Sequence, residues 1–316
     1  MFSKIKSYYN ITRLNWVKIP CPICNIKDCT NLLNRDRYLF DIKLSICEKC
    51  SLVFTSKNLS KNDLNFFYKK YYRYFYENID SISHDYLYNS KDYLKASSRF
   101  SEIKKIIPNF KNILEIGCGL GFFLNEAKKE NKKILGFEPG ETFYNFIKNN
   151  NQIAKYVIND DFLNYSEKNI DVDLVVMFHV LEHLEDPNLI LKKIFDKTNE
   201  NVNLVVEVPD IDQCDNGLGL MNYHFGHRWY FSLYSLNKIL KKNKFYIYKI
   251  TKSINDGIYP GYIRVFANKI NNNNELISDG NIDYINNLKK KIKSSTKIGK
   301  FKNTSYLYRL LSLLKY

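Results

Sequence analysis

The feature that most restricts the possible folds of this chain is an apolar run followed by three glycines at every second position. Ile113–Ile116 has the composition of a buried strand, and Gly117, Gly119 and Gly121 follow it. Glycine lets the backbone turn tightly and approach a ligand closely because it has no Cβ. The amide groups at the start of the helix expected over residues 122–129 would point at that ligand. The run therefore predicts a strand, a tight loop and a helix around a bound group, the alternative being a glycine turn without a ligand.

Two acidic residues flank this loop at informative positions. Glu115 precedes the first glycine by two residues, and Glu138 follows the next apolar run, Ile134–Phe137. An acid at the end of the second strand commonly holds a ribose diol. A G-x-G-x-G sequence alone is a weak signal shared by many nucleotide-binding loops, so the two acids carry much of the interpretation.

Together these residues resemble the class I S-adenosylmethionine (SAM)-dependent methyltransferases. The resemblance implies that SAM is the cofactor, that the glycine loop faces its methionine part and that Glu138 holds its ribose hydroxyls. The dehydrogenase alternative fits less well, because its loop is usually G-x-G-x-x-G and because it leaves Glu115 unexplained. The cofactor contacts expected in this region are Glu115, Gly117, Cys118, Gly119, Gly121, Glu138 and Pro139.

Strand and helix patterns alternate along the middle of the chain. Strands are predicted at residues 112–116, 133–137, 156–158, 173–178, 203–208, 245–251 and 261–268. Helices are predicted near residues 121–130, 141–149, 187–197 and 233–242. Such alternation is typical of a mostly parallel sheet covered by helices. We therefore predict an α/β fold with a Rossmann-like, seven-stranded methyltransferase core, whose last strand is antiparallel by the same resemblance.

Two later stretches of this core are also expected at the cofactor. By resemblance, Asp161 hydrogen-bonds the adenine amino group and Phe162 flanks the ring, the alternative being an ordinary loop with a helix cap. Phe178 and His179 end the fourth predicted strand, at the edge where open α/β sheets bind ligands. The family often reads HVLEHL here, as residues 179–184 do, and this implies cofactor contacts from Phe178 and His179.

The same stretch contains Glu182 and His183, for which a structural role is open. The loop after the fifth strand carries His224 and His227, of which His227 matches a family histidine by resemblance. Gly226 stands where the related sugar C-methyltransferases place a catalytic glutamate. Methylation of carbon requires removal of a proton next to a carbonyl, and the related enzymes use this carboxylate for that step. Methylation of oxygen requires only a base for a hydroxyl, which one histidine can provide.

We therefore predict O-methylation rather than C-methylation. His227 is the expected general base and His224 the alternative base, with His179 as a further catalytic candidate. C-methylation remains the alternative, because His224 could replace the missing glutamate as the base.

Four cysteines near the start of the chain form two C-x-x-C pairs. Cys21 and Cys24 make the first pair and Cys47 and Cys50 the second, with 22 residues between them. In a chain without an export signal this spacing indicates a closed tetrahedral site for a structural Zn²⁺ ion. Cys29 is a bystander or an alternative ligand.

A narrower family of zinc-containing methyltransferases resembles this chain in three features together. These are the SAM motifs, the two cysteine pairs and the tyrosine-rich stretch that follows the cysteines. That family includes sugar C-methyltransferases and relatives encoded with surface-polysaccharide genes, and the resemblance covers about residues 20–270. It implies an N-terminal lobe over the active site and a small polar acceptor, either a nucleotide-linked sugar or a surface-polysaccharide precursor. We expect a zinc-ribbon lobe at 1–58, a helical connector at 59–107, the SAM-binding domain at 108–272 and a basic helical tail at 273–316.

The net charge of +15 raises the question of an acidic partner such as nucleic acid or a membrane. Much of this charge lies at the end of the chain, since residues 281–316 hold nine lysines and arginines and one acid. We favour a solvated face over a nucleic-acid surface, and docking of the tail on the core or on a partner subunit over membrane contact. The remaining alternatives are an RNA methyltransferase that docks through the ribbon and tail, and a non-catalytic SAM-binding scaffold. We find no transmembrane run or signal peptide and expect a cytoplasmic protein of open oligomeric state. Four leucines of the tail repeat at helical spacing, namely Leu307, Leu310, Leu311 and Leu314.

Overall fold

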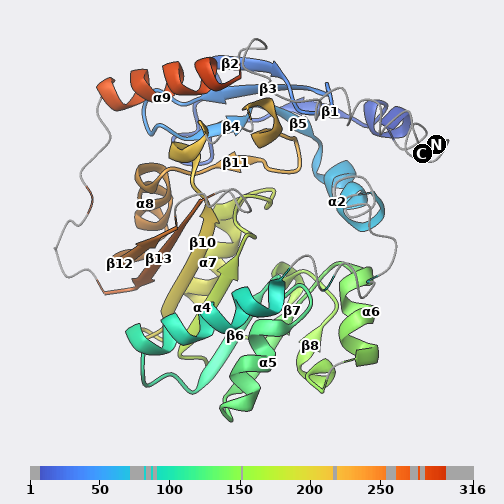
Figure 1. The fold of residues 1–316 in the computed structure, drawn as a ribbon, viewed down its shortest axis with the longest axis vertical. Coiled ribbons are helices and arrows are strands. Elements are labelled where there is room, and N and C mark those ends of the chain that lie inside the picture. Colours follow the sequence, from blue (N-terminus) through green and yellow to red (C-terminus); the bar gives the residue numbers. More distant parts are fainter. Residues whose placement is uncertain are drawn as a thin grey trace.

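A computed structural model describes residues 8–71, 82, 87, 91–150, 152–215, 219–253, 261–270, 277 and 282–296 of the 316-residue chain. Figure 1 shows a large sheet with its helices in the lower part of the view and a smaller β-rich lobe above it.

The large sheet has seven strands in the order β12-β13-β10-β9-β6-β7-β8. They are β6 Asn112–Ile116, β7 Lys133–Phe137, β8 Val157–Ile158, β9 Leu174–Phe178, β10 Asn203–Pro209, β12 Tyr246–Lys252 and β13 Tyr262–Asn268. Strands β6 to β10 pair in parallel, whereas β13 is antiparallel to both of its neighbours, β10 and β12. The predicted α/β class and seven strands are confirmed, and the last strand in the sequence is the antiparallel one.

Helices connect the strands of this sheet. They are α4 Asp92–Ile106, α5 Phe122–Lys129, α6 Glu141–Asn150, α7 Pro187–Lys197 and α8 Leu233–Lys242, with 3₁₀ turns η2 Ala154–Tyr156, η3 Phe162–Asn164, η4 Ile211–Gln213 and η5 Gly219–Asn222. The Asp186 side chain caps α7 by accepting from the Asn188 N–H, and Ser232 and Ser235 form a capping box at the start of α8. Within the described ranges, no helix is both long and apolar enough to cross a membrane.

The central strands are buried, as expected for a parallel sheet with helices on its faces. All five residues of β9 are buried, and so are the five inner residues of β10. One of those inner residues is a carboxylate, Glu207. The carboxyl ends of β6, β7, β9 and β10 meet at one edge of the sheet, which is the edge where this architecture binds ligands.

The smaller lobe combines segments that lie far apart in the sequence. It contains β1 Trp16–Lys18, β2 Thr30–Arg35, β3 Asp41–Ile46, β4 Val53–Thr55, β5 Lys57–Leu59 and β11 Trp229–Tyr230. An antiparallel sheet has the order β11-β4-β3-β2, and β1 pairs with β5. In the pair β11–β4, Trp229 lies opposite Phe54 and Tyr230 opposite Val53. The loop that precedes β11, and carries two of the predicted catalytic histidines, is therefore fastened to the N-terminal lobe.

Two further helices belong to this part of the molecule, α2 Lys61–Lys70 and α9 Ile282–Ser295. Helix α9 lies along β2 at the top of Figure 1, and the Tyr284 hydroxyl donates to Asp212 Oδ1 at 2.7 Å. The described part of the basic tail therefore packs on its own chain. The leucine repeat at 307–314 and most of the tyrosine-rich stretch after residue 71 lie outside the described residues.

Candidate active site

The glycine loop has the backbone conformation that its sequence requires. Gly117, Gly119 and Gly121 all have positive φ values, of 72°, 57° and 74°. A Cβ at Gly117 would lie 2.6 Å from Val180, and one at Gly121 would lie 2.6 Å from Ile153. A Cβ at Gly119 would have nothing nearer than 3.8 Å. The first and third glycines are therefore needed for packing, whereas the second leaves room beside the loop.

Glu138 fastens this loop to the end of β7. Its Oε2 accepts from the Gly119 N–H and its Oε1 from the Gly140 N–H, both at 2.8 Å. The Asn159 side chain donates to the Glu138 carbonyl at 2.8 Å. Pro139 separates Glu138 from the loop that enters α6. The predicted ribose-binding acid thus lies beside the glycine loop with its carboxylate already oriented.

Glu115 lies in β6, between Gly136 of β7 and Val176 of β9. Its carboxyl is buried, and Oε2 has no hydrogen-bond partner among the described residues. Burial raises the pKa of this carboxyl well above its usual range, although Arg99 acts in the opposite direction. A buried polar atom of this kind is costly unless a ligand or a proton satisfies it. Cys118, the next expected contact, is also buried, and its N–H donates to the Phe137 carbonyl.

Asp161 and Phe162 lie after β8, where the cofactor's adenine was expected. Asp161 caps the turn η3, because its Oδ1 accepts from the Leu163 N–H at 2.9 Å. Phe162 is buried against Phe137, with ring centroids 5.2 Å apart. The structure therefore brings Asp161 to the sheet edge but holds the ring of Phe162 in the core.

The residues at the end of β9 form the centre of the site. Phe178 packs edge-on against Phe123, and the Arg99 guanidinium lies 4.6 Å from its ring centroid. His179 has a φ of +56°, which is uncommon for a residue with a side chain and is often found at functional sites. Its Nε2 lies 3.0 Å from Glu207 Oε1, and its Nδ1 lies 3.4 Å from Glu182 Oε1.

The charges around His179 determine its protonation. Burial would lower the pKa of His179, but the carboxylates of Glu182 and Glu207 raise it to about 9. His179 is therefore a charged hydrogen-bond donor at neutral pH. A ring in this state can bind a ligand, but it is not available as a base.

A buried ion cluster lies behind His179, and the sequence reasoning missed it. Glu207 in β10 faces Arg99 of α4 and Arg264 of β13, and Arg264 also pairs with Glu102. Burial would raise the pKa of Glu207, but Arg99 and His179 lower it to about 2. The carboxylate inside the apolar strand VVEVP was the only sequence signal, and it did not identify the partners.

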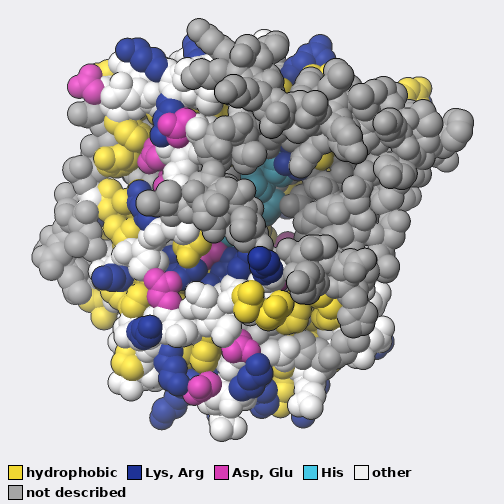
Figure 2. All heavy atoms as spheres, viewed as in Figure 1, with side chains coloured by type: hydrophobic (Ala, Val, Ile, Leu, Met, Phe, Trp, Pro, Cys, Tyr) yellow, Lys and Arg dark blue, Asp and Glu magenta, His cyan; other side chains and the backbone are white. Residues whose placement is uncertain are grey.

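All four described histidines belong to one chain of contacts. His179 contacts Glu182, and the Nε2 of His183 lies 3.9 Å from the same carboxylate. The rings of His183 and His227 have centroids 4.6 Å apart, and those of His227 and His224 lie 4.1 Å apart. Figure 2 shows histidine side chains in a hollow near the middle of this face. The structure thus brings together the three predicted catalytic histidines and places His183 between them.

The outer two histidines of this chain have lowered pKa values. Burial lowers the pKa of His227 well below its usual value, and His183 adds to this effect. Burial likewise lowers the pKa of His224, with His227 as the next cause. Both rings are therefore neutral at pH 7 and can accept a proton, although each is a weaker base than an exposed histidine.

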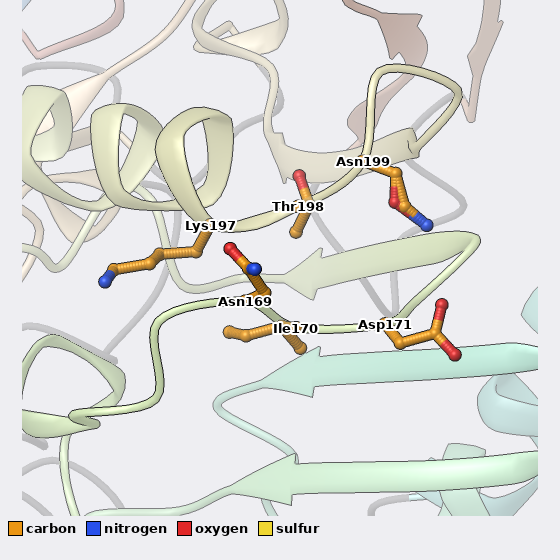
Figure 3. A pocket seen from close by; sticks show the side chains of 6 residues that line it. All are labelled: Asn169, Ile170, Asp171, Lys197, Thr198 and Asn199. Atoms are coloured by element: carbon orange, nitrogen blue, oxygen red, sulfur yellow. The ribbon is translucent and has the colours of Figure 1, made fainter.

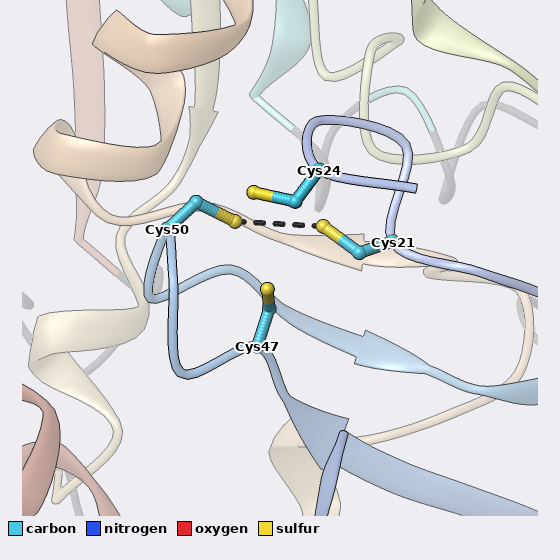
Figure 4. A group of neighbouring side chains, drawn as sticks. All are labelled: Cys21, Cys24, Cys47 and Cys50. Carbon is cyan, nitrogen blue, oxygen red and sulfur yellow. Dashed lines mark hydrogen bonds between the residues drawn. The ribbon is translucent and has the colours of Figure 1, made fainter. Parts of the chain in front are cut away.

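The four predicted zinc ligands converge in the small lobe. The thiols of Cys21, Cys24, Cys47 and Cys50 all lie within 4.8 Å of one another, and Cys21 Sγ and Cys50 Sγ are 3.4 Å apart. Figure 4 shows the four sulfur atoms pointing toward a common centre from two turns. Four converging thiols are the donor set of a structural zinc site. Cys29 is not one of this group, and its thiol lies 3.7 Å from the Ile26 carbonyl.

A separate pocket lies near Ile170 and Thr198, which form an isolated β-bridge (Figure 3). It is lined by Asn169, Ile170, Asp171, Lys197, Thr198 and Asn199. Asp171 accepts from the Asn112 side chain at the amino end of β6, which places the pocket at the sheet edge opposite the glycine loop. Open α/β sheets bind their ligands at the carboxyl edge, so this pocket is not the candidate active site.

Comparison with known proteins adds a family and a fold. Residues 88–250 match the family described as a methyltransferase domain. The magnesium protoporphyrin IX methyltransferase from Synechocystis is similar over 67% of this chain and 100% of its own, with a TM-score of 0.50 and 13% identity. A SAM-dependent methyltransferase from Archaeoglobus fulgidus is similar over 59% of this chain and 100% of its own, with a TM-score of 0.46 and 20% identity. No curated protein sequence matches the chain.

Proposed function

The chain belongs to the methyltransferase-domain family of SAM-dependent enzymes, and from this premise we propose that it transfers a methyl group to a hydroxyl of a small polar acceptor. The observation that carries the proposal is that the glycine loop lies beside Val180, the residue that follows His179. The Cα of Gly117 faces Val180 so closely that a Cβ would lie 2.6 Å from it, and Val180 lies next to His179. A cofactor at the loop and an acceptor at the histidines would therefore be neighbours.

The residues of the loop fit SAM as the bound group. Glu138 offers an oriented carboxylate for ribose hydroxyls. Among the described residues the buried Oε2 of Glu115 has no hydrogen-bond partner, and a polar ligand group could provide one. The open side of Gly119 gives the ligand room against the backbone. SAM supplies an activated methyl group on a positively charged sulfur, so the protein has mainly to bind, align and exclude water.

The acceptor side is assigned to His227, with His224 as the alternative. A neutral imidazole can take the proton from an acceptor hydroxyl as the oxygen attacks the methyl group. His227 fits this role because burial keeps it neutral and because its ring lies between those of His183 and His224. Gly226 offers no carboxylate, which favours oxygen over carbon as the methylated atom.

The acceptor class rests on sequence resemblance. We propose a nucleotide-linked sugar or a surface-polysaccharide precursor, in keeping with the similarity to zinc-containing sugar methyltransferases. We also propose that Cys21, Cys24, Cys47 and Cys50 hold a structural Zn²⁺ ion. The turn with Cys21 and Cys24 is attached to the core, because the Pro22 carbonyl accepts from Asn188 of α7 and Lys242 of α8.

The experiment that tests the acceptor class follows a labelled methyl group. Purified protein and methyl-labelled SAM are incubated with extract from the protein's own source, and the label is counted in small molecules, glycan, RNA and protein. Label in nucleotide sugars or glycan supports the proposal. Label in RNA would replace it with an RNA methyltransferase, and failure to bind SAM would leave only a scaffold.

The general base is tested by replacing each of two neighbouring histidines, His227 and His224. We expect His227→Asn to lower kcat by about 100-fold or more, since a base typically contributes 10² to 10⁴. SAM affinity, measured by calorimetry, should be nearly unchanged because the glycine loop is intact. If His224→Asn loses the rate and His227→Asn keeps it, the two histidines exchange roles; if neither does, the assignment is wrong.

A further inference from the structure

Glu182, in the turn after β9, has a carboxylate whose environment is incomplete. The side chain is 1% exposed, and within the described part of the chain neither of its oxygens accepts a hydrogen bond. Its nearest partners, His179 Nδ1 at 3.4 Å and His183 Nε2 at 3.9 Å, both lie toward Oε1. The charged ring of His179 lies on the Oε1 side only, and burying the carboxylate without hydrogen bonds is costly, so a further group is expected beside it.

His183 is held in the orientation of a metal ligand. Its Nδ1 lies 2.8 Å from the Gly226 carbonyl, which can only accept, so Nδ1 carries the hydrogen. The lone pair of the neutral ring is then on Nε2, the atom that faces Glu182. The Tyr68 hydroxyl donates to the same carbonyl at 2.6 Å and supports this arrangement. Histidines that bind metals commonly donate their other ring N–H to a backbone carbonyl in this way.

His227 adds a third donor from a different segment. One ligand atom each of Glu182, His183 and His227 lies within 4.8 Å of the other two. The two segments are joined by backbone bonds, because the Glu182 carbonyl accepts from the N–H groups of Arg228 and Trp229 at 2.9 and 3.2 Å. The three side chains are therefore brought together by the fold and do not depend on a ligand to assemble them.

We infer that Glu182, His183 and His227 bind a second metal ion, a divalent transition metal such as zinc, separate from the four-cysteine site. Two imidazoles and one carboxylate are the donor set of catalytic zinc and of related transition-metal sites, and three protein ligands leave at least one position open. Ligands at about 2.1 Å from one zinc lie roughly 3.4 Å apart, so the side chains approach by about an ångström on binding. In the proposed function, on which this use of the site rests, the open position takes an oxygen of the acceptor. A metal-bound His227 has no free lone pair, so with the ion in place the base is the alternative already named, His224.

A proton alone explains the geometry less well. An imidazolium at His183 would face only Oε1 of Glu182, and Oε2 would still have no hydrogen-bond partner among the residues that the structure describes. His179 is already directed at Glu207 through Nε2 at 3.0 Å. A metal ion is small enough to contact both rings and the carboxylate together, and it satisfies all three ligands at once.

The test is a metal count on the full chain, independent of methyl transfer. The protein is saturated with Zn²⁺, passed over a weak chelating resin and measured for bound metal; a parallel Co²⁺ titration separates thiolate from nitrogen–oxygen coordination by absorption. We expect two ions per chain in the wild type and one in both Glu182→Gln and His227→Asn. The control His224→Asn replaces the neighbouring imidazole and should retain two, and Cys47→Ser should lose only the thiolate signal.

One ion per wild-type chain, or two in both ligand variants, would overturn the inference. Circular dichroism confirms that each variant is folded, and if Glu182→Gln is not, His227→Asn decides. The readout is bound metal, so it separates this inference from the proposed function. Two ions per chain without methyl transfer would support the metal site and count against the proposed function. Methyl transfer with one ion per chain would support the proposed function and overturn the metal site.

Discussion

Replacing Glu207 with glutamine tests whether the ion cluster at the end of β10 stabilises the fold. Glu207 is fully buried, and the Nε atoms of Arg99 and Arg264 lie 3.1 and 2.8 Å from its oxygens. Arg264 is itself only 2% exposed. Removing the negative charge leaves both guanidinium groups and His179 without their shared partner in a setting that solvent cannot screen.

Two arguments give the size of the effect. Burial would raise the pKa of Glu207, yet Arg99 and His179 lower it from 4.5 to about 2, a shift that corresponds to about 3 kcal/mol. Removing one partner of a buried ion pair costs roughly 3–5 kcal/mol. We therefore expect Glu207→Gln to lower the free energy of unfolding by about 3 kcal/mol at pH 7.

The pH dependence has a definite sign. Because the pKa of Glu207 is lower in the folded protein, its stabilisation is fully present above about pH 4.5 and is lost as the pH falls toward 2. The glutamine variant has no such carboxyl. Its free energy of unfolding should therefore fall less steeply than that of the wild type in this window.

The assay is urea unfolding at pH 7, followed by circular dichroism, with Glu102→Gln as the matched control. Glu102 pairs with the same Arg264, but its side chain is 30% exposed. Its loss should cost less than about 1 kcal/mol, as for other solvent-screened pairs. Equal losses in the two variants, or less than about 1 kcal/mol for Glu207→Gln, would refute the reasoning.

Three further predictions concern the cofactor loop and the cysteine site. Glu138→Gln loses a charge-assisted acceptor and should weaken SAM binding about 10- to 100-fold by calorimetry; unchanged affinity would remove Glu138 from the site. Gly121→Ala should lower the free energy of unfolding by about 2–3 kcal/mol, because of its φ of +74° and the contact with Ile153. Gly119→Ala should lower stability less and SAM affinity more than Gly121→Ala does. A larger loss of stability in Gly119→Ala than in Gly121→Ala would contradict the loop geometry. A strong chelator, or Cys47→Ser, should lower the thermal midpoint by circular dichroism; an unaltered midpoint would argue against structural zinc.

The sheet could be predicted from the sequence because its signals are local. Each central strand is a short apolar run bounded by turn residues, and the predicted ranges agree with β6, β7, β9, β10, β12 and β13 to within a residue or two. The glycine loop was also a local signal, since Gly117 and Gly121 combine a positive φ with a close neighbour that a Cβ would displace. Both the strand patterns and the glycine positions can therefore be recognised from a few adjacent residues.

The contacts that the sequence did not reveal are long-range. The pairing of Trp229 with Phe54 joins residues far apart in the sequence, and β11 is too short to give a periodic pattern. Glu207 was visible as an acid in an apolar strand, but any arginine could have been its partner; Arg99 and Arg264 were selected only by packing of α4 and β13. His183 gave no signal of its central position, because a ring's neighbours depend on the fold around it.

The position of β11 links the cysteine site to the proposed chemistry. Cys50 precedes β4 by three residues, and β4 pairs with β11. The N–H of Trp229 in β11 donates to the carbonyl of Glu182, beside the histidines. The glycine loop belongs instead to β6, in the other sheet. If the four cysteines hold zinc as proposed, its removal should disturb the histidine chain before it disturbs the cofactor loop. We therefore expect removal of the metal to lower the rate of methyl transfer more than it lowers SAM affinity.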